Sequence, residues 1–356
     1  MAYTTIDDPS AYFNSLIYTG NVTVRALTFD GNSDLAVDWI WLKSRSISGN
    51  HHLYDSVRGT QKHLRSNLDS AEGTNGGTDG VTAFSSNGVT IGTNTASNDD
   101  GETFVGWGWK AGTSFTNDAS STSIGSIDSA GSVSDVSGFS IVSFTGTGSN
   151  GTIKHGLSTA PDLFIIKRRD SANDWRVGSS ALTNFVKHVN LNTTAAESDL
   201  AVAFNSTGPT TSVFSVGTSI STNANGGTYI AYCFSSIKGY SKVGSYTGNN
   251  SVTDGTFVYT GFKPAFVMVK LIDSQTDNWI MQDNKINSFN GASSQRLRPN
   301  SSGAEFTSTN EIDFLSNGFK CRGDDGEFNG DGFSYIYMAF AESPFVTSTE
   351  VPATAR

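Results

Sequence analysis

One strand-like pattern occurs three times in this chain of 356 residues. Each copy begins with glycine, has a hydroxyl residue two positions later, and continues as a dense run of aromatic, aliphatic and small residues. Runs of this kind are typical of buried β-strands. The copies cover residues 101–109, 226–234 and 332–340. This recurrence predicts three repeats of about 100 residues, each long enough to own a small hydrophobic core.

Four further landmarks precede the closing strand and keep the same order in each repeat. An aromatic-Thr-Gly entry is followed by an apolar run ending in lysine, a turn ending in Ala-Glu, a hairpin signal and the closing strand. A continuous apolar run is expected where a strand is covered on both faces. The entries lie at residues 18–20, 144–146 and 246–248, the lysines are Lys43, Lys167 and Lys270, the glutamates are Glu72, Glu197 and Glu305, and the hairpin signals lie at residues 86–88, 206–208 and 316–318.

The coarse fold follows from the spacing of short apolar runs. There are about seven or eight such runs per repeat, and no segment has a convincing helical period. We therefore predict an all-β fold of three tandem antiparallel β-sandwich repeats, jelly-roll-like in character. A single closed body with internal threefold symmetry is the alternative. The predicted segments are an N-terminal arm (1–13), repeat 1 (14–112), a Ser/Thr/Gly/Asp-rich linker (113–137), repeat 2 (138–238), repeat 3 (239–346) and a C-terminal tail (347–356).

The charge balance argues against nucleic acid as a partner. The formal charge is −10 and the pI is about 4.9, whereas phosphate binding needs clustered Lys and Arg. No apolar run approaches the roughly 20 residues of a membrane span, and residues 1–8 do not resemble a signal peptide. We therefore expect a protein made in the cytoplasm, without a membrane span. Cys233 and Cys321 stand at non-equivalent places, and we interpret both as small core residues.

The acidic residues favour structure over catalysis. A glycosidase needs two carboxyl groups about 5–10 Å apart, whereas each repeat supplies one shared glutamate, which we expect to serve a turn or an ion pair with the shared lysines. Residues 324–331 are oxygen-rich like a calcium loop but do not follow the EF-hand register, so we interpret them as a turn, with a bound ion as the alternative. No phosphate loop or nucleophile elbow is present, and the sequence assigns no catalytic, cofactor-binding or metal residue.

Histidines and tryptophans outside the landmarks have two interpretations each. His51, His52 and His63 form a local group with the chemistry of a metal site, but adjacent residues of a strand point to opposite faces, so we assign no metal. Trp175 and Trp279 occupy matching places after the shared lysines. Stacking on a sugar is one interpretation; we favour the simpler one, that both are core residues.

Four segments carry a resemblance to a known group of proteins: residues 2–13, 53–59, 107–112 and 339–346. On these, the chain resembles repeat-containing virion structural proteins, often tail-fibre-like, of tailed marine bacteriophages that infect cyanobacteria and oceanic heterotrophs. The resemblance implies a virion location on the particle exterior and a homo-oligomer, with a trimer expected from the class. It brings no catalytic residues.

The expected function is therefore that of a virion structural protein, a tail fibre or tail appendage in host adsorption. Two alternatives stay open: a capsid decoration or head fibre protein docked by residues 1–13, and a virion-borne polysaccharide depolymerase. Expected partners are other virion proteins and a host-surface glycan or protein, and no cofactor is expected. Recognition would use the loops that the repeats do not share, around residues 51–65, 174–188 and 277–298. The candidate surface-recognition residues are His51, His52, Tyr54, Arg58, His63, Arg176, Lys187, His188, Lys285, Arg296 and Arg298.

Overall fold

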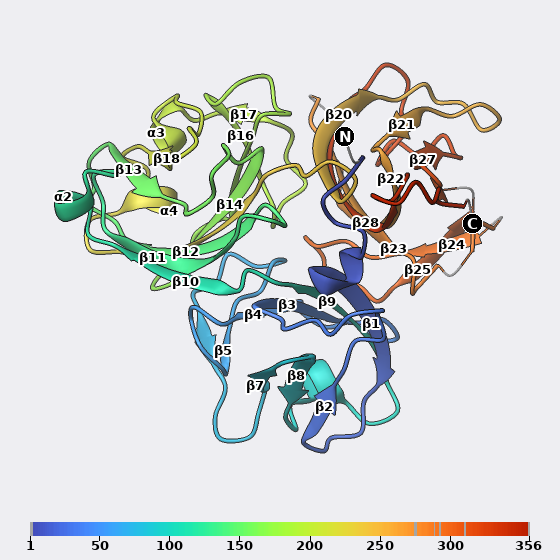
Figure 1. Cartoon of the computed structure of the whole chain (residues 1–356), viewed down its shortest axis with the longest axis horizontal. Helices are drawn as coiled ribbons and strands as arrows, with labels where there is room; N and C mark the ends of the chain where they lie inside the picture. The colour runs from blue at the N-terminus through green and yellow to red at the C-terminus, as the bar shows by residue number, and fades with distance from the viewer. Residues whose placement is uncertain (1–2, 274–275, 288, 292, 310, 355–356) are drawn as a thin grey trace.

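The computed structural model describes residues 3–273, 276–287, 289–291, 293–309 and 311–354. Its regular structure is almost entirely antiparallel β-sheet, which confirms the predicted all-β class. Figure 1 shows three β-rich lobes around a common centre. We call residues 13–112, 113–238 and 239–346 the first, second and third lobes. No helix in the described ranges is long and apolar enough to cross a membrane.

In the first lobe, two sheets face each other across a small core. The inner sheet has the strand order β1-β9-β3-β4 and the outer sheet the order β2-β8-β7. Leu16, Ile40 and Leu42 of the inner sheet pack with Leu27 and Val89 of the outer sheet. The elements are η1 (Pro9–Ala11), β1 (Phe13–Thr19), β2 (Arg25–Leu27), β3 (Trp39–Ser44), β4 (His52–Asp55), β5 (Lys62–His63), β6 (Gly73–Thr74), β7 (Val81–Ser85), β8 (Gly88–Ile91), α1 (Thr95–Asn98) and β9 (Thr103–Trp109).

The other two lobes repeat this plan. Their inner sheets contain the orders β12-β19-β14-β15 and β20-β28-β22-β23, and their outer sheets are β13-β18 and β21-β27-β26. The second lobe has β12 (Phe139–Thr145), β13 (Gly151–Lys154), β14 (Leu163–Arg168), β15 (Arg176–Ser179), β16 (Lys187–Asn190), β17 (Ser198–Asp199), α3 (Ala201–Phe204), β18 (Val213–Val216), α4 (Ile220–Asn223) and β19 (Thr228–Phe234). The third has β20 (Ser241–Thr247), β21 (Phe257–Tyr259), β22 (Phe262–Leu271), β23 (Trp279–Asp283), β24 (Ser293–Arg296), β25 (Phe306–Thr309), β26 (Ile312–Leu315), β27 (Gly318–Cys321) and β28 (Ser334–Pro344).

The predicted linker at residues 113–137 is instead part of the second lobe. It forms β10 (Thr113–Asn117), the single turn α2 (Ala119–Thr122) and β11 (Ser129–Ser134), which extend the inner sheet in the order β10-β11-β12. Asp118 caps α2 by accepting from the N–H groups of Ser120 and Ser121. The prediction of a linker was wrong because small hydroxyl residues also suit strands at the margin of a sheet, where little apolar surface is buried.

The three inner sheets turn their second faces toward one another and share one aromatic core. The ring of Trp39 stacks on that of Tyr232 in the second lobe with centroids 4.4 Å apart, and Phe13 stacks on Phe340 in the third at 5.0 Å. Phe234 meets Phe340 at 5.9 Å, which joins the second and third lobes. All five side chains are at most 2% exposed. The runs that end in the shared lysines are thus covered on both faces, as predicted.

Backbone hydrogen bonds close the lobes into a ring. The N–H of Glu72 in the first lobe donates to the carbonyl oxygen of Arg169 in the second at 2.8 Å. The N–H of Glu197 in the second donates to Ile272 in the third at 3.1 Å, and that of Glu305 in the third returns to Arg45 in the first at 2.7 Å. The Ala-Glu turn of each lobe therefore holds the next lobe. The arrangement is the closed body that the sequence left as the alternative to separate tandem sandwiches.

The N-terminal arm lies against the third lobe and the last residue of the second. The Tyr3 hydroxyl donates to the Gly261 carbonyl at 2.7 Å, and the Thr4 hydroxyl donates to the Lys238 carbonyl at 2.9 Å. Ile6 is 3% exposed and belongs to the shared aromatic core. The described part of the arm is thus packed as an integral part of the ring.

The glycine of the aromatic-Thr-Gly entry is required by a close backbone approach. A Cβ on Gly20 would lie 2.0 Å from the Asp99 carbonyl oxygen. We expect Gly20→Ala to lower the free energy of unfolding by about 1–3 kcal/mol, the usual cost of overpacking. Gly49→Ala is the matched control, because a methyl group added there would have no described atom within 4 Å apart from its chain neighbours. Urea unfolding of both variants measures the difference, and equal stabilities would contradict this account.

Candidate functional site

Residues that all repeats share hold the fold together. The entry aromatic stacks on an aromatic of the closing strand at 5.2, 5.1 and 5.0 Å in the three lobes. An asparagine before the closing strand bridges two loops by donating to two carbonyl groups and accepting from a backbone N–H. These asparagines are Asn98, Asn223 and Asn329. The sequence analysis missed this role, although each asparagine stands five residues before the hydroxyl residue of the closing strand.

Two of the three shared glutamates pair with arginines. Of the two structural roles expected, a turn or an ion pair with the shared lysines, the ion pair was wrong. Glu72 accepts two hydrogen bonds from Arg169, at 2.9 and 3.0 Å, and Glu305 accepts two from Arg45, at 2.6 and 3.0 Å. The forked guanidinium matches a carboxylate in this bidentate way, which an ammonium group does not. Glu197 instead accepts from the Thr183 hydroxyl, because Ile272 occupies the place of the arginine.

The shared lysines are buried and donate to backbone carbonyl groups. Lys167 Nζ donates to Asp69 of the first lobe at 3.1 Å, and Lys270 Nζ donates to Thr194 of the second at 3.0 Å. Burial lowers the pKa of Lys43, Lys167 and Lys270 to about 8. The ammonium groups of Lys167 and Lys270 therefore act at lobe junctions, whereas that of Lys43 donates to Ser44 of its own lobe.

Trp175 and Trp279 are core residues, as predicted, with 0% and 1% exposure. Their indole N–H groups donate across lobe junctions, to the carbonyl oxygens of Arg65 at 3.0 Å and Asn190 at 2.9 Å. In the first lobe His51 takes the equivalent place, with its Nε2 3.0 Å from the Arg298 carbonyl oxygen.

The neighbouring histidine lies on the other side of the strand. Trp41 Nε1 donates to His51 Nδ1, while the ring of His52 stacks near His63 with centroids 4.9 Å apart. The expectation that His51 and His52 point to opposite faces is thus confirmed. Among the described residues no group of three or more His, Cys, Asp or Glu side chains has an arrangement that could hold a metal ion.

Seven of the eleven candidate surface-recognition residues are buried, so their interpretation as surface residues was wrong. They are His51, His52, Tyr54, Arg58, His63, His188 and Arg296. The other four candidates are partly exposed: Arg176, Lys187, Lys285 and Arg298.

The strongest electrostatic site lies inside the junction of the first and second lobes. Arg58 Nε donates to Asp55 Oδ2 at 2.5 Å, and its Nη1 donates to Glu72 Oε2 at 3.2 Å. The Tyr232 hydroxyl also donates to Asp55 Oδ2, at 2.7 Å. Neither the Arg58 nor the Asp55 side chain is exposed. We interpret this group, together with Arg169, as a structural ion network, because no solvent reaches its central pair.

A second ion network lies within the third lobe. Arg296 pairs with Glu311, Asp325 and Glu327 at 3.1, 2.8 and 2.9 Å, and Arg298 pairs with Glu327 at 2.6 Å. Burial raises the pKa of Glu311 to about 7 and also raises that of Glu327. The sequence analysis missed Glu311, since no local pattern marks it.

The oxygen-rich segment at residues 324–331 contains a turn, as the favoured interpretation predicted. The N–H groups of Phe328 and Asn329 donate to the Asp325 carbonyl, and the Glu327 N–H donates to the Asp325 carboxylate. Cys321 beside it and Cys233 are free and buried, which confirms them as core residues. Burial raises the pKa of both thiols to about 12.

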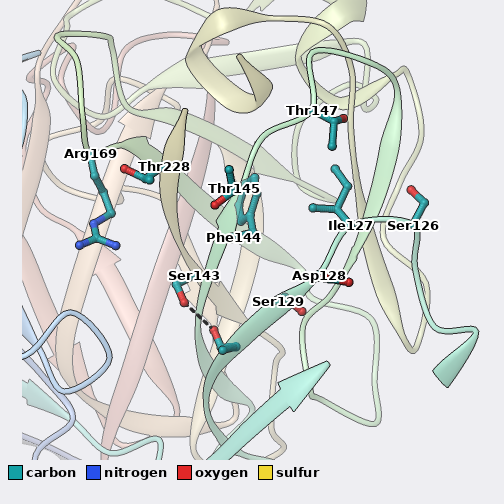
Figure 2. A pocket seen from close by; sticks show the side chains of 11 residues that line it. Ser126, Ile127, Asp128, Ser129, Ser143, Phe144, Thr145, Thr147, Arg169 and Thr228 are labelled. Atoms are coloured by element: carbon teal, nitrogen blue, oxygen red, sulfur yellow. Dashed lines mark hydrogen bonds between the residues drawn. The ribbon is translucent and has the colours of Figure 1, made fainter. Parts of the chain in front are cut away.

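Two of the open hollows in the described part of the chain are candidate sites for a polar ligand. A groove of about 600 Å³ lies beside β12, and Figure 2 shows hydroxyl side chains along it, with Asp128 on one side and Arg169 on the other. Its hydroxyl residues are Ser126, Ser129, Ser143, Thr145, Thr147 and Thr228. Phe144 contributes little surface because it is 6% exposed. Such a groove can donate and accept hydrogen bonds but offers no nucleophile-base pair, so its chemistry suits binding of a polar ligand.

The second hollow is an acidic cleft of about 390 Å³ between the first and third lobes, lined in part by Asp8, Asp30 and Glu342. The three carboxylates have partners: Asp8 accepts from Ser10 and Ser33, Asp30 pairs with Lys285 at 2.8 Å, and Glu342 pairs with Lys263 at 2.9 Å. Lys285, one of the candidate recognition residues, thus crosses this cleft from the third lobe to the first.

The comparison with family models decides what the whole ring is related to. A family described as a domain of unknown function (DUF7483) matches residues 8–344. The chain belongs to this family. No curated protein matches it. The DUF7483 match spans all three lobes, so in this chain the family unit corresponds to the complete ring and not to a single lobe.

Buried neutral histidines make this DUF7483 chain sensitive to acid. Burial lowers the pKa of His52 to about 3 and those of His63 and His188 to about 4, whereas unfolded histidine titrates near 6.5. The unfolded chain therefore binds more protons as pH falls, and we expect the free energy of unfolding to fall between about pH 6.5 and 4. Glu311 has the opposite effect on the free energy of unfolding between about pH 4.5 and 7, because its pKa is raised in the folded protein. It is one group against several histidines.

Urea unfolding across this pH range measures the effect. His63→Gln should flatten the pH dependence, because it removes one of the groups whose pKa is lowered in the folded protein. A wild-type stability that is constant or rising as pH falls from 6.5 to 4 would contradict the prediction.

Proposed function

We propose that this DUF7483 protein is a structural protein of the virion of a tailed bacteriophage, exposed on the particle, which takes part in host adsorption as a tail fibre or tail appendage. In this proposal each lobe is a jelly-roll-like β-sandwich repeat. The chain is made in the host cytoplasm, assembles as a homo-oligomer, with a trimer expected, and joins other virion proteins on the particle exterior.

The observation that carries the proposal is the closure of three equivalent lobes around one aromatic core. The landmark residues that recur in all lobes are used for packing, caps and lobe junctions. What differs between the lobes is the loops on their periphery. Rigid scaffolds that carry variable loops are a common way to build recognition surfaces. The resemblance of residues 2–13 and 339–346 to virion proteins adds the biological setting.

Host recognition would use the partly exposed cations and the two hollows. Arg176 and Lys187 lie on the rim of the second lobe, and Lys285 borders the acidic cleft. The hydroxyl-rich groove beside β12 is matched to a polar ligand such as a host-surface glycan, while a host-surface protein would use the loops. No nucleic acid and no cofactor enter this proposal.

Immunogold electron microscopy of purified virions, with antibodies against the complete chain, tests the location. The proposal predicts gold on the tail or its appendages, and reduced adsorption of virions to host cells when purified protein is added in excess. Particles that carry no label would contradict a virion role. Label confined to the head would favour the first alternative, a capsid decoration or head fibre.

In the depolymerase alternative the active site would be the acidic cleft, where three carboxylates line one hollow. Their hydrogen bonds and ion pairs favour a structural role, so we propose that the protein is not an enzyme. Release of oligosaccharides from host envelope material by wild-type protein, lost in Asp8→Asn and Asp30→Asn, would support the alternative. Lys187→Gln is the matched control, since it removes a surface charge outside the cleft.

A further inference from the structure

The inner sheets of the lobes differ at one edge. In the second lobe the entry strand β12 is covered by β11, which pairs with it antiparallel, with Ser132 opposite Ile141 and Ala130 opposite Ser143. In the third lobe the equivalent strand β20 is the last strand of its sheet. The same edge is therefore covered by the chain itself in one lobe and open in another.

The open edge of β20 presents backbone N–H groups outward. The Gly248 N–H donates inward to Phe333, beside β28, whereas the Val243 N–H donates away from β28 to the Ser236 hydroxyl. Because N–H direction alternates along a strand, those of Ser245 and Thr247 also point away from β28. Both residues are exposed. Unpaired donors and acceptors of an edge strand are a template for another strand.

A groove of about 350 Å³ crosses the sheet beside this edge, from β20 past Ser334 of β28 to Ile272. Ser245, Tyr246 and Thr247 form one wall, and residues 181–183 of the second lobe form the other. Its volume falls within the roughly 300–1,000 Å³ of ligand sites. The groove occurs at the junction where Ile272 takes the place of the arginine, which in the groove beside β12 is Arg169.

We propose that an extended segment of another protein adds to the open edge of β20 as an antiparallel strand, beside this groove. The chemistry of the segment follows from β11, which covers the equivalent edge and consists of Ser, Ala, Gly and Val. At Gly131 of β11 a Cβ would lie 2.0 Å from the Ile141 carbonyl oxygen, so the strand on this edge needs small residues. The partner segment is accordingly short, uncharged and rich in small residues.

A second copy of this chain is the poorer occupant. Its own small-residue strand β11 is already paired with β12, so it would have to leave its sheet before pairing with β20. A strand from a different protein carries no such cost. The proposal is independent of the virion role, since it rests on the β20 edge, the groove and the precedent of β11.

Hydrogen exchange on the complete chain tests the proposal. The probe is a synthetic peptide with the sequence of β11, residues 129–134, with both ends capped, and its inactive control has proline in place of Ser132, whose N–H faces β12 in the intact chain. We expect the first peptide to slow amide exchange at residues 244–247, and the second to leave it unchanged.

Ser245→Pro removes one outward N–H of β20 and leaves its pairing with β28 intact, which edge strands tolerate. It should weaken peptide binding by at least about threefold to tenfold, which corresponds to the net free energy of one hydrogen bond. Ser245→Ala keeps the N–H and should bind like wild type. If Ser245→Pro fails to fold, the comparison of the two peptides on wild-type protein decides alone.

Three outcomes would overturn the proposal. They are no protection of residues 244–247 at millimolar peptide, equal protection by the proline-containing peptide, and protection of these residues by self-association of the chain in the absence of peptide. The last outcome would assign the edge to a second copy.

Discussion

Replacing Arg58 with alanine is expected to lower the free energy of unfolding by about 3–5 kcal/mol, the cost of removing one partner from a buried ion pair. The Arg58 side chain is fully buried and donates to Asp55, Glu72 and the Leu53 carbonyl oxygen. Without it, the buried Asp55 carboxylate keeps only the Tyr232 hydroxyl and the backbone as donors. The lost interactions lie at the junction between the first and second lobes.

Arg168→Ala is the matched control for Arg58→Ala. Arg168 pairs with Asp170 at 3.0 Å, but both groups are partly exposed, and such pairs contribute about 0–1 kcal/mol. Chemical denaturation of both variants gives the two values under one condition. A loss below about 1 kcal/mol for Arg58→Ala would show that water or another donor replaces the guanidinium, contrary to the network described above.

Trp39→Ala should also cost about 3–5 kcal/mol, because it opens a large cavity in the shared aromatic core. Trp39 is 0% exposed, and its ring lies 4.4 Å from that of Tyr232 and 5.8 Å from that of Phe139, both in the second lobe. The variant should therefore destabilise two lobes together. Thermal unfolding followed by circular dichroism measures the shift.

Val252→Ala is the control for Trp39→Ala, since Val252 is 53% exposed and its truncation should change stability by no more than about 0.5 kcal/mol. Loss of structure confined to the first lobe in Trp39→Ala, with the second lobe unchanged by hydrogen exchange, would contradict a core shared between lobes.

Local patterns predicted the parts of the fold that depend on local chemistry. The apolar runs before Lys43, Lys167 and Lys270 are strands buried on both faces, and Trp175 and Trp279 are core residues. These predictions succeed because burial of a strand requires the same kinds of residues wherever the strand lies in the fold.

Some predictions failed where a polar residue finds a partner in another lobe, and others, as for Arg296 with Glu311 and Glu327, where the partner lies elsewhere in the same lobe. Arg58 and His51 look like surface residues in the sequence, yet Asp55, Tyr232 and the Arg298 carbonyl satisfy their polar atoms inside the ring. The pairing of Glu72 and Glu305 with arginines depends in the same way on ring closure. No pattern within one repeat indicates which repeat will stand beside it.

The three junctions of the ring are not equivalent. The open edge of β20, where we propose that a partner strand adds, lies beside the junction that differs. Glu72 and Glu305 each hold an arginine of the next lobe, whereas Glu197 faces Ile272 across the second and third lobes. The groove beside β20 opens at that third junction. The residues that recur in all three lobes thus build the scaffold, and the places where one lobe differs from the others are the candidate binding surfaces.

Differential scanning calorimetry of the intact chain tests the closed ring most directly. The shared core and the three backbone closures predict one unfolding transition, with a calorimetric enthalpy equal to the van't Hoff enthalpy. Two or three separate transitions, each with the enthalpy of a domain of about 100 residues, would contradict the account and would show that the lobes fold as independent units.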